Sequence, residues 1–164
     1  MSEDLYSGPS GQLISMVMNT GSGHHANGHE QLARELTDYF KQQGFEVDLY
    51  LLTKAQQLSQ VVRQAIRKHQ REGGIIVAAG GDGTLNTVAQ ELQHTRIKMG
   101  IIPLGTFNYV ARALNIPLDP FAAAEVIATG IPRGVHVGTV NDYIYLNNAS
   151  IGLYAKIIEQ RELH

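Results

Sequence analysis

Short apolar runs alternate with amphipathic helical patterns along most of the chain. Four runs predict strands, at 13–18, 45–52, 75–79 and 99–102. Between them, apolar residues recur three and four positions apart, as in helices that bury one face. The run at 75–79 is apolar throughout, which is typical of a strand covered on both faces of a parallel sheet. Strands that alternate with helices imply right-handed βαβ crossovers. We therefore expect a Rossmann-like α/β domain with three layers and a mainly parallel sheet.

A different pattern begins after Gly130. Two apolar stretches, 135–140 and 143–146, flank an Asn-Asp turn and predict a β-hairpin. A helical pattern follows over 153–163. We interpret this change as the start of a second, β-rich domain.

The chain is therefore expected to have three segments. These are a lead-in at 1–11, an α/β domain at 12–130 and the beginning of a β-rich second domain at 131–164. The lead-in is polar and contains Pro9, which predicts disorder. Because the last helical pattern is still running at His164, we expect the sequence to be a fragment of a longer protein.

A glycine-rich turn, Gly80-Gly81-Asp82-Gly83-Thr84, lies between the most apolar strand and the helix that follows it. Glycine has no Cβ atom, so backbone N–H groups in such a turn can approach an anion closely. The helix N-terminus adds unpaired donors and the positive end of the helix dipole. The turn therefore predicts a phosphate-binding site.

Asp82 restricts how that site can work. At about 4 Å and an effective dielectric near 20, each like-charge pair of carboxylate and phosphate costs roughly 4 kcal/mol. Either Mg²⁺ lies between Asp82 and the phosphates, or Asp82 turns away and braces the loop. A third interpretation is purely structural: a tight turn capped by Thr84, with Asp82 in solvent.

Glycine-containing turns also follow two other predicted strands, at 19–23 and 103–108. In a parallel sheet, the turns after the strands all lie at the carboxyl edge, where open α/β sheets bind ligands. Three such turns are expected to converge there, which supports a ligand site independently of any family.

The same stretches resemble a known family. Gly-Gly-Asp-Gly-Thr at 80–84, followed by Pro-Leu-Gly-Thr-Phe-Asn-Tyr-Val-Ala-Arg at 103–112, is similar to the catalytic domain of diacylglycerol and sphingosine kinases. The resemblance extends from about residue 12 to the end. It implies the fold shared with NAD kinases and transfer of the γ-phosphoryl group of ATP to a lipid hydroxyl, with Mg²⁺ as cofactor.

The resemblance also implies roles for individual residues. Backbone donors of the turn would hold the phosphates, and Asp82 would act indirectly, through Mg²⁺. The residues expected at the nucleotide are Asn19, Thr53, Gly80, Gly81, Asp82, Gly83, Thr84, Leu85 and Thr106. Those expected on the substrate side are Asn108, Tyr109 and Arg112. The catalytic base is expected beyond His164, so this chain alone should have little or no kinase activity.

Some of these residues have ordinary alternatives. Asn19 could cap its turn, Thr53 could cap the next helix, and Arg112 could form a surface ion pair. Phe107 and Tyr109 stand where relatives often have glycine and aspartate. They are expected either to line an apolar entrance for lipid or to pack against the second domain.

Two further residues depart from the family pattern, and a group of three histidines raises the question of a metal site. Thr20 replaces a proline, which predicts a looser turn, and His136 replaces an aspartate without an evident consequence. His24, His25 and His29 are close in sequence, but we expect a solvated loop rather than a metal site.

Other functions stay open. The stretch 21–26 fits a GxGxxA dinucleotide fingerprint, which suggests an NAD-dependent oxidoreductase, although no acidic residue ends the second strand. A kinase acting on NAD or another soluble molecule, and a nucleotide-binding module without catalysis, are the remaining alternatives.

Composition limits the partners. The net charge is −2, so nothing predicts binding to nucleic acid. There is no cysteine and no apolar run long enough to span a bilayer. A cytoplasmic enzyme is expected, with its lipid reached by peripheral contact at the inner membrane face; a homodimer is left open.

Overall fold

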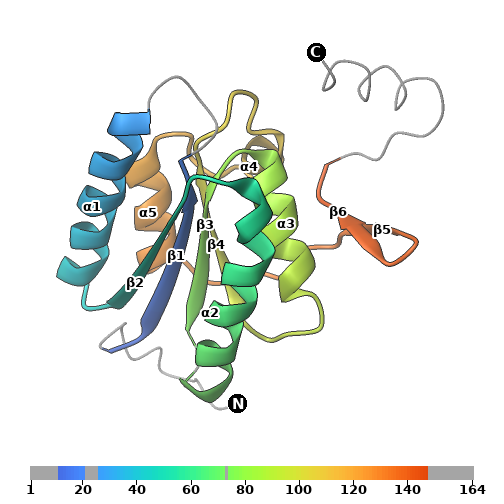
Figure 1. Ribbon diagram of the computed structural model, residues 1–164, viewed down its shortest axis with the longest axis horizontal. Helices are drawn as coiled ribbons and strands as arrows, with labels where there is room; N and C mark the ends of the chain where they lie inside the picture. The colour runs from blue at the N-terminus through green and yellow to red at the C-terminus, as the bar shows by residue number, and fades with distance from the viewer. Residues whose placement is uncertain (1–10, 21–25, 73, 148–164) are drawn as a thin grey trace.

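The computed structural model describes residues 11–20, 26–72 and 74–147 (Figure 1). The elements in chain order are β1 (Leu13–Asn19), α1 (Ala26–Gln42), β2 (Glu46–Leu52), a 3₁₀ turn (Ala55–Gln57), α2 (Leu58–Glu72), β3 (Ile75–Gly80), α3 (Asp82–Leu92), β4 (Lys98–Pro103), α4 (Tyr109–Ala113), α5 (Pro120–Thr129), β5 (Gly138–Val140) and β6 (Tyr143–Tyr145). The predicted α/β alternation is confirmed. Predictions for residues 1–10 of the lead-in, for residues 21–25 in the first turn and the dinucleotide fingerprint, and for the helix at 153–163 lie outside the described residues.

The sheet of the α/β part is parallel, with strand order β2-β1-β3-β4. Asn19 at the end of β1 pairs with Leu52 at the end of β2, and Gly80 of β3 pairs with Pro103 of β4. The carboxyl ends of all four strands therefore meet at one edge, at the top of Figure 1. The turns after β3 and β4 are therefore neighbours, as predicted, while most of the turn after β1 lies outside the described residues.

Helices cover both faces of this sheet. α1 and α5 pack on one face, while α2 and α3 pack on the other (Figure 1). Every residue of β3 is buried, because its side chains alternate between the two cores. The expectation of a three-layer domain is thus confirmed, and the apolar run at 75–79 is explained by burial on both sides.

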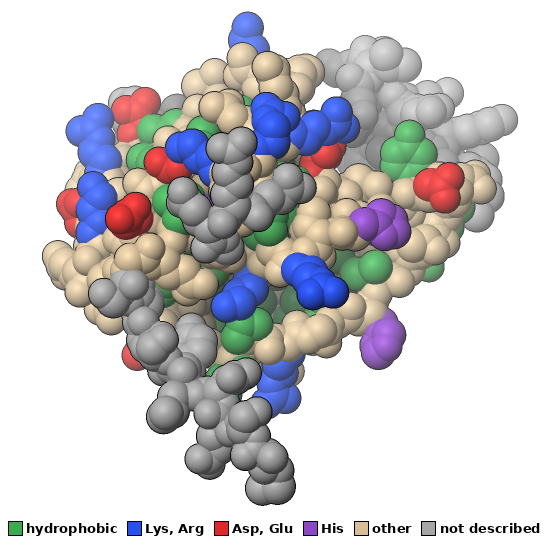
Figure 2. Space-filling view, turned by 90° about the horizontal axis from the view of Figure 1, so that it is seen from below, with side chains coloured by type: hydrophobic (Ala, Val, Ile, Leu, Met, Phe, Trp, Pro, Cys, Tyr) green, Lys and Arg blue, Asp and Glu red, His purple; other side chains and the backbone are tan. Residues whose placement is uncertain are grey.

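The opposite, amino edge of the sheet has a different surface. Figure 2 shows this face, where positively and negatively charged side chains are interspersed.

Among the described helices, none combines the length and apolar character needed to cross a membrane.

A two-stranded antiparallel hairpin, β5–β6, lies beside α3 (Figure 1). Asn141 and Asp142 both have positive φ, at 48° and 67°, as a two-residue type I′ turn requires. The hairpin is therefore confirmed, but β5 is shorter than predicted. Val135 and Val137 precede it in an exposed, extended connection rather than in the strand.

Candidate phosphate-binding site

The turn between β3 and α3 is built around Gly80 and Gly81. A Cβ atom on Gly80 would lie 2.7 Å from the Thr84 side chain, so only glycine lets the turn close over this threonine. Gly81 is the N-cap residue of α3, and no side chain caps the helix. The interpretation of a turn capped by Thr84 is therefore wrong, and the first N–H groups of α3 have no partner within the helix.

Gly83 lies in the first turn of α3 and is exposed. A Cβ atom placed on it would meet no other atom within 4 Å. The first turn of α3 thus has open space beside Gly83. Leu85, by contrast, is fully buried in the core, and its N–H donates to the Gly81 carbonyl at 3.1 Å. Leu85 therefore anchors the turn to the core and has no exposed surface for a ligand.

Asp82 joins this turn to the next one. Its Oδ2 accepts from the N–H of Tyr109 at 3.1 Å, and its Oδ1 accepts from the N–H of Val110 at 3.0 Å. These are the first two residues of α4, whose N-terminal donors would otherwise lack helical partners. Of the alternatives that the sequence left open for Asp82, the structure shows the brace.

The turn after β4 packs directly against the turn after β3. The Leu104 N–H donates to the Gly80 carbonyl at 2.9 Å. A Cβ atom on Gly105 would lie 2.6 Å from the Cα atom of Gly81, so the two backbones touch where both residues are glycine. The two glycine turns therefore form one unit at the carboxyl edge of the sheet.

Asn108 closes the second turn on itself. Its amide oxygen accepts from the Gly105 N–H, and its amide nitrogen donates to the Gly105 carbonyl, both at 2.8 Å. The residue is buried and has a left-handed φ of 52°, a conformation that asparagine tolerates better than most residues. Asn108, which was expected on the substrate side, therefore uses both polar atoms of its side chain within its own loop.

Thr20 connects the first two strands at the same edge. Its N–H and its hydroxyl both donate to the Leu52 carbonyl, at 2.7 and 3.1 Å. The residue that replaces the family's proline is therefore buried and anchored, while the rest of its turn lies outside the described residues. Its neighbours Asn19 and Thr53 stand at the ends of β1 and β2, with Asn19 partly buried and Thr53 exposed.

The outer rim of the second turn is apolar. The rings of Phe107 and Tyr109 stack in parallel, with centroids 5.4 Å apart, and are 62% and 54% exposed. Arg112 donates from Nε to the Phe107 carbonyl at 3.0 Å, and no described residue forms an ion pair with it. The ion pair considered for Arg112 thus has no partner among the described residues. Thr106 is exposed between these rings and the glycine turn.

The histidines considered as metal ligands do not lie in the two glycine turns. His29 lies on α1, whereas His24 and His25 are outside the described residues. Within the described ranges, no group of three His, Asp or Glu side chains could hold a metal ion. His136 is exposed in the connection before β5.

Two interlocked glycine turns beside a helix N-terminus, at the carboxyl edge of a parallel sheet, are typical of α/β domains that bind phosphate groups. Comparison with known proteins identifies the family. The profile of the diacylglycerol kinase catalytic domain matches residues 14–140, and the chain belongs to this family.

Individual relatives agree with this assignment. Diacylglycerol kinases from two Staphylococcus aureus strains, bovine RF122 and MRSA252, are each 35% identical over 136 residues, covering 80% of this chain. The match covers 42% of each relative, so the chain spans less than half of their length.

Solved structures confirm the fold. A diacylglycerol kinase crystal structure from Bacillus anthracis superposes with a TM-score of 0.65 at 19% identity, over 83% of this chain and 50% of that one. A putative diacylglycerol kinase from the same organism gives 0.67 at 21% identity, over 83% and 47%.

Proposed function

We propose that this chain is the nucleotide-binding part of an ATP-dependent lipid kinase that phosphorylates a diacylglycerol-like hydroxyl. In the reaction, the lipid oxygen forms a bond to the γ-phosphorus of ATP and the bond to the β-phosphate oxygen breaks, releasing ADP. The hydroxyl proton passes to a general base, which we expect in the part of the protein beyond His164. Such transfer depends on positioning and charge neutralisation.

The main observation behind this proposal is the close contact between the two glycine turns, after β3 and after β4. Gly80 and Gly81 form the turn at the N-terminus of α3, and Gly83 in the first turn of that helix is exposed. A helix N-terminus that no side chain caps offers backbone donors to an anion. Thr84, Thr106 and the strand-end residues Asn19 and Thr53 are proposed to border the nucleotide. These are the residues that the family resemblance assigns to it.

The chemistry of the site also fits magnesium bound mainly by phosphate. Both Asp82 oxygens already accept hydrogen bonds from α4. Mg²⁺ favours phosphate oxygens and keeps several waters, so it needs few direct protein ligands. We propose that the ATP phosphates hold the ion and that Asp82 reaches it indirectly, through water.

A single added methyl group tests where phosphate binds. In Gly83→Ala the new Cβ meets no protein atom, so the melting temperature should stay within about 2 °C of the wild type. If phosphate occupies the space beside Gly83, calorimetric titration with MgATP should show an affinity at least about tenfold lower.

Gly134→Ala is the matched control, because that glycine also has open space around it but lies in the connection before β5. Equal ATP affinity in both variants would contradict this site. Binding of NAD(H) in place of ATP would instead support the alternative dinucleotide site at 21–26.

The stacked rings of Phe107 and Tyr109 suggest how the lipid is reached. They are apolar, largely exposed and next to the phosphate turn, and aromatic side chains favour the interface between bilayer and water. We propose that this ring pair contacts the membrane surface from the cytoplasmic side, delivering the lipid hydroxyl to the nucleotide.

Removing both rings tests this contact. Phe107→Ser with Tyr109→Ser in the complete gene product should raise the KM for diacylglycerol in vesicles about tenfold or more, with the KM for ATP unchanged. Val126→Ser, which removes an exposed apolar side chain from α5, should change neither. A lower melting temperature without a change in lipid KM would show that the rings pack against another part of the protein.

A further inference from the structure

Two side chains of α3 hold the edge of the β5–β6 hairpin. Asn86 accepts from the Leu146 N–H at 3.1 Å and donates to the Ile144 carbonyl at 3.2 Å. Gln90 accepts from the Ile144 N–H at 2.8 Å and donates to the Asp142 carbonyl at 3.2 Å. Each side-chain amide therefore uses both its oxygen and its nitrogen on the backbone of the hairpin. We call Asn86 and Gln90 the amide pair.

The spacing of the amide pair matches the repeat of a strand edge. Groups two residues apart on one edge of a strand are separated by about 6.8 Å, and residues four apart on a helix are separated by about 6 Å along its axis. Asp142, Ile144 and Leu146 present such an edge to α3. Among the described residues no strand pairs with this edge, and the amide pair takes the place of one.

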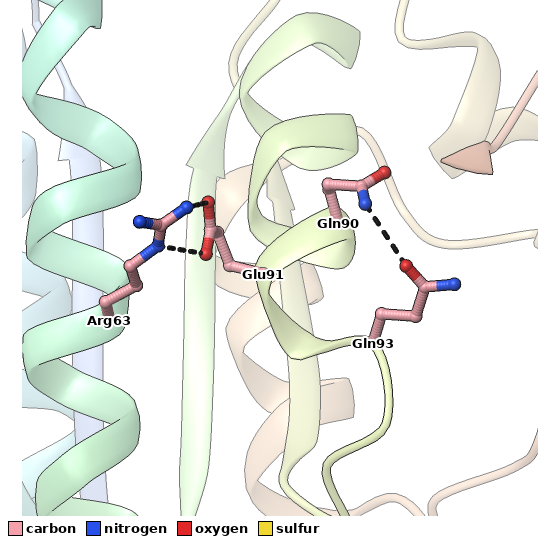
Figure 3. Close-up of polar contacts among 4 residues, drawn as sticks. All are labelled: Arg63, Gln90, Glu91 and Gln93. Carbon is pink, nitrogen blue, oxygen red and sulfur yellow. Dashed lines mark hydrogen bonds and ion pairs between the residues drawn. The ribbon is translucent and has the colours of Figure 1, made fainter. Parts of the chain in front are cut away.

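The helix that bears the amide pair is fixed on its other side. Glu91 of α3 forms a two-pronged ion pair with Arg63 of α2, with N···O distances of 2.6 and 3.0 Å. Figure 3 shows Glu91 directed toward α2 while Gln90 leaves α3 on the side away from Arg63. Gln90 also donates to Gln93 at 3.1 Å, at the end of the same helix. These contacts orient Gln90 toward the hairpin.

The same short helix also forms the phosphate turn. Asp82 and Gly83 occupy its first turn, and Asn86 follows Asp82 by four residues, which is about 6 Å along the axis. A displacement of the hairpin relative to α3 would therefore change its position relative to the glycine turns as well. Ile144 is buried at this contact, which adds apolar packing to the hydrogen bonds.

We propose that the amide pair fixes the position of the hairpin relative to α3, and therefore relative to the phosphate-binding turn at the start of that helix. Asn86 and Gln90 are positioning residues: they act through the hairpin and touch neither nucleotide nor lipid. This role in the reaction rests on the proposed kinase function. The hydrogen bonds between the amide pair and the hairpin do not depend on that function.

Isosteric acids test the proposal with little change in packing. Asn86→Asp and Gln90→Glu keep an oxygen for the Leu146 and Ile144 N–H groups, but they lose the donor and place a carboxylate beside a carbonyl oxygen. In this chain, amide hydrogen exchange at Ile144 and Leu146 should become about tenfold faster in each variant, with MgATP affinity within twofold. Gln93→Glu is the control, because Gln93 accepts a hydrogen bond from Gln90 and forms none with the described residues of the hairpin.

Kinetics of the complete gene product test the positioning role. Both variants should lower kcat about tenfold and leave the KM for ATP unchanged, while Gln93→Glu keeps the wild-type values. Unchanged exchange at Ile144 and Leu146 would overturn the proposal, as would faster exchange with wild-type kcat. If the wild type binds ATP without transferring phosphate, the proposed function fails, and the exchange comparison alone decides whether the amide pair holds the hairpin.

Discussion

Asp82→Asn should lower phosphoryl transfer by about 100-fold and weaken ATP binding both with and without Mg²⁺. The carboxylate accepts from two adjacent N–H groups at the start of α4, and an amide can accept through only one of its two ends. The other end would direct an NH₂ group at a backbone donor, at a cost of about 1–3 kcal/mol. The start of α4, and with it the second glycine turn, should shift away from the first. At about 1.4 kcal/mol per tenfold, the upper part of that range corresponds to the expected loss of rate.

Titration with ATP and with MgATP checks this expectation, and Asp38→Asn serves as control because it makes the same change on the exposed surface of α1. The comparison separates the brace from a role through metal. If only the Mg²⁺-dependent part of the affinity is lost in Asp82→Asn, the brace is not what the nucleotide needs.

Gly105→Ala should separate the two glycine turns. The added Cβ would lie 2.6 Å from the Cα atom of Gly81 and 2.9 Å from Oδ1 of Asn108. Neither neighbour is the end of a flexible side chain, since one is backbone and the other is fixed by two hydrogen bonds to Gly105 itself. Overpacking of this kind costs about 1–3 kcal/mol, so we expect the melting temperature to fall by about 5–10 °C and MgATP binding to be lost.

Thermal unfolding followed by calorimetric titration checks this, with Gly134→Ala as the matched control. A Cβ atom added to Gly134 would have no other atom within 4 Å, so this position should tolerate the same methyl group. A Gly105→Ala variant that melts and binds like Gly134→Ala would show that close contact between the turns is not required.

The fold was largely predictable because its signals are local. The apolar run at 75–79 has no polar position, which only a strand covered on both faces explains. The glycine turn follows it at once, and the parallel arrangement then places the carboxyl ends of β1, β3 and β4 at one edge. Each step needs only the residues next to one another in the sequence and the rules of sheet topology.

The contacts that join the turns were not predictable in the same way. Asp82 bonds residues 27 and 28 positions later, and nothing near Asp82 in sequence distinguishes a brace from a metal contact. The hydroxyl of Thr20 likewise reaches a carbonyl 32 residues away. Such pairings depend on which strands are neighbours, and the sequence pattern does not specify that order.

The amide pair was missed for a related reason. Asn86 and Gln90 stand four residues apart on the polar face of an amphipathic helix, which on its own indicates only contact with solvent. Their partners are backbone groups of the hairpin, 52 to 60 residues further along. Every residue type offers the same backbone groups, so the sequence of the hairpin does not indicate a contact with α3.

The most direct test of the proposed lipid kinase function is transfer of label from [γ-³²P]ATP by the complete gene product to diacylglycerol in mixed vesicles, with NAD as a competing acceptor. We predict labelled phosphatidic acid that requires Mg²⁺ and falls by about 100-fold in Asp82→Asn but not in Asp38→Asn. Label on NAD with none on lipid, or lipid phosphorylation that Asp82→Asn leaves unchanged, would contradict this function and the role of the brace in it.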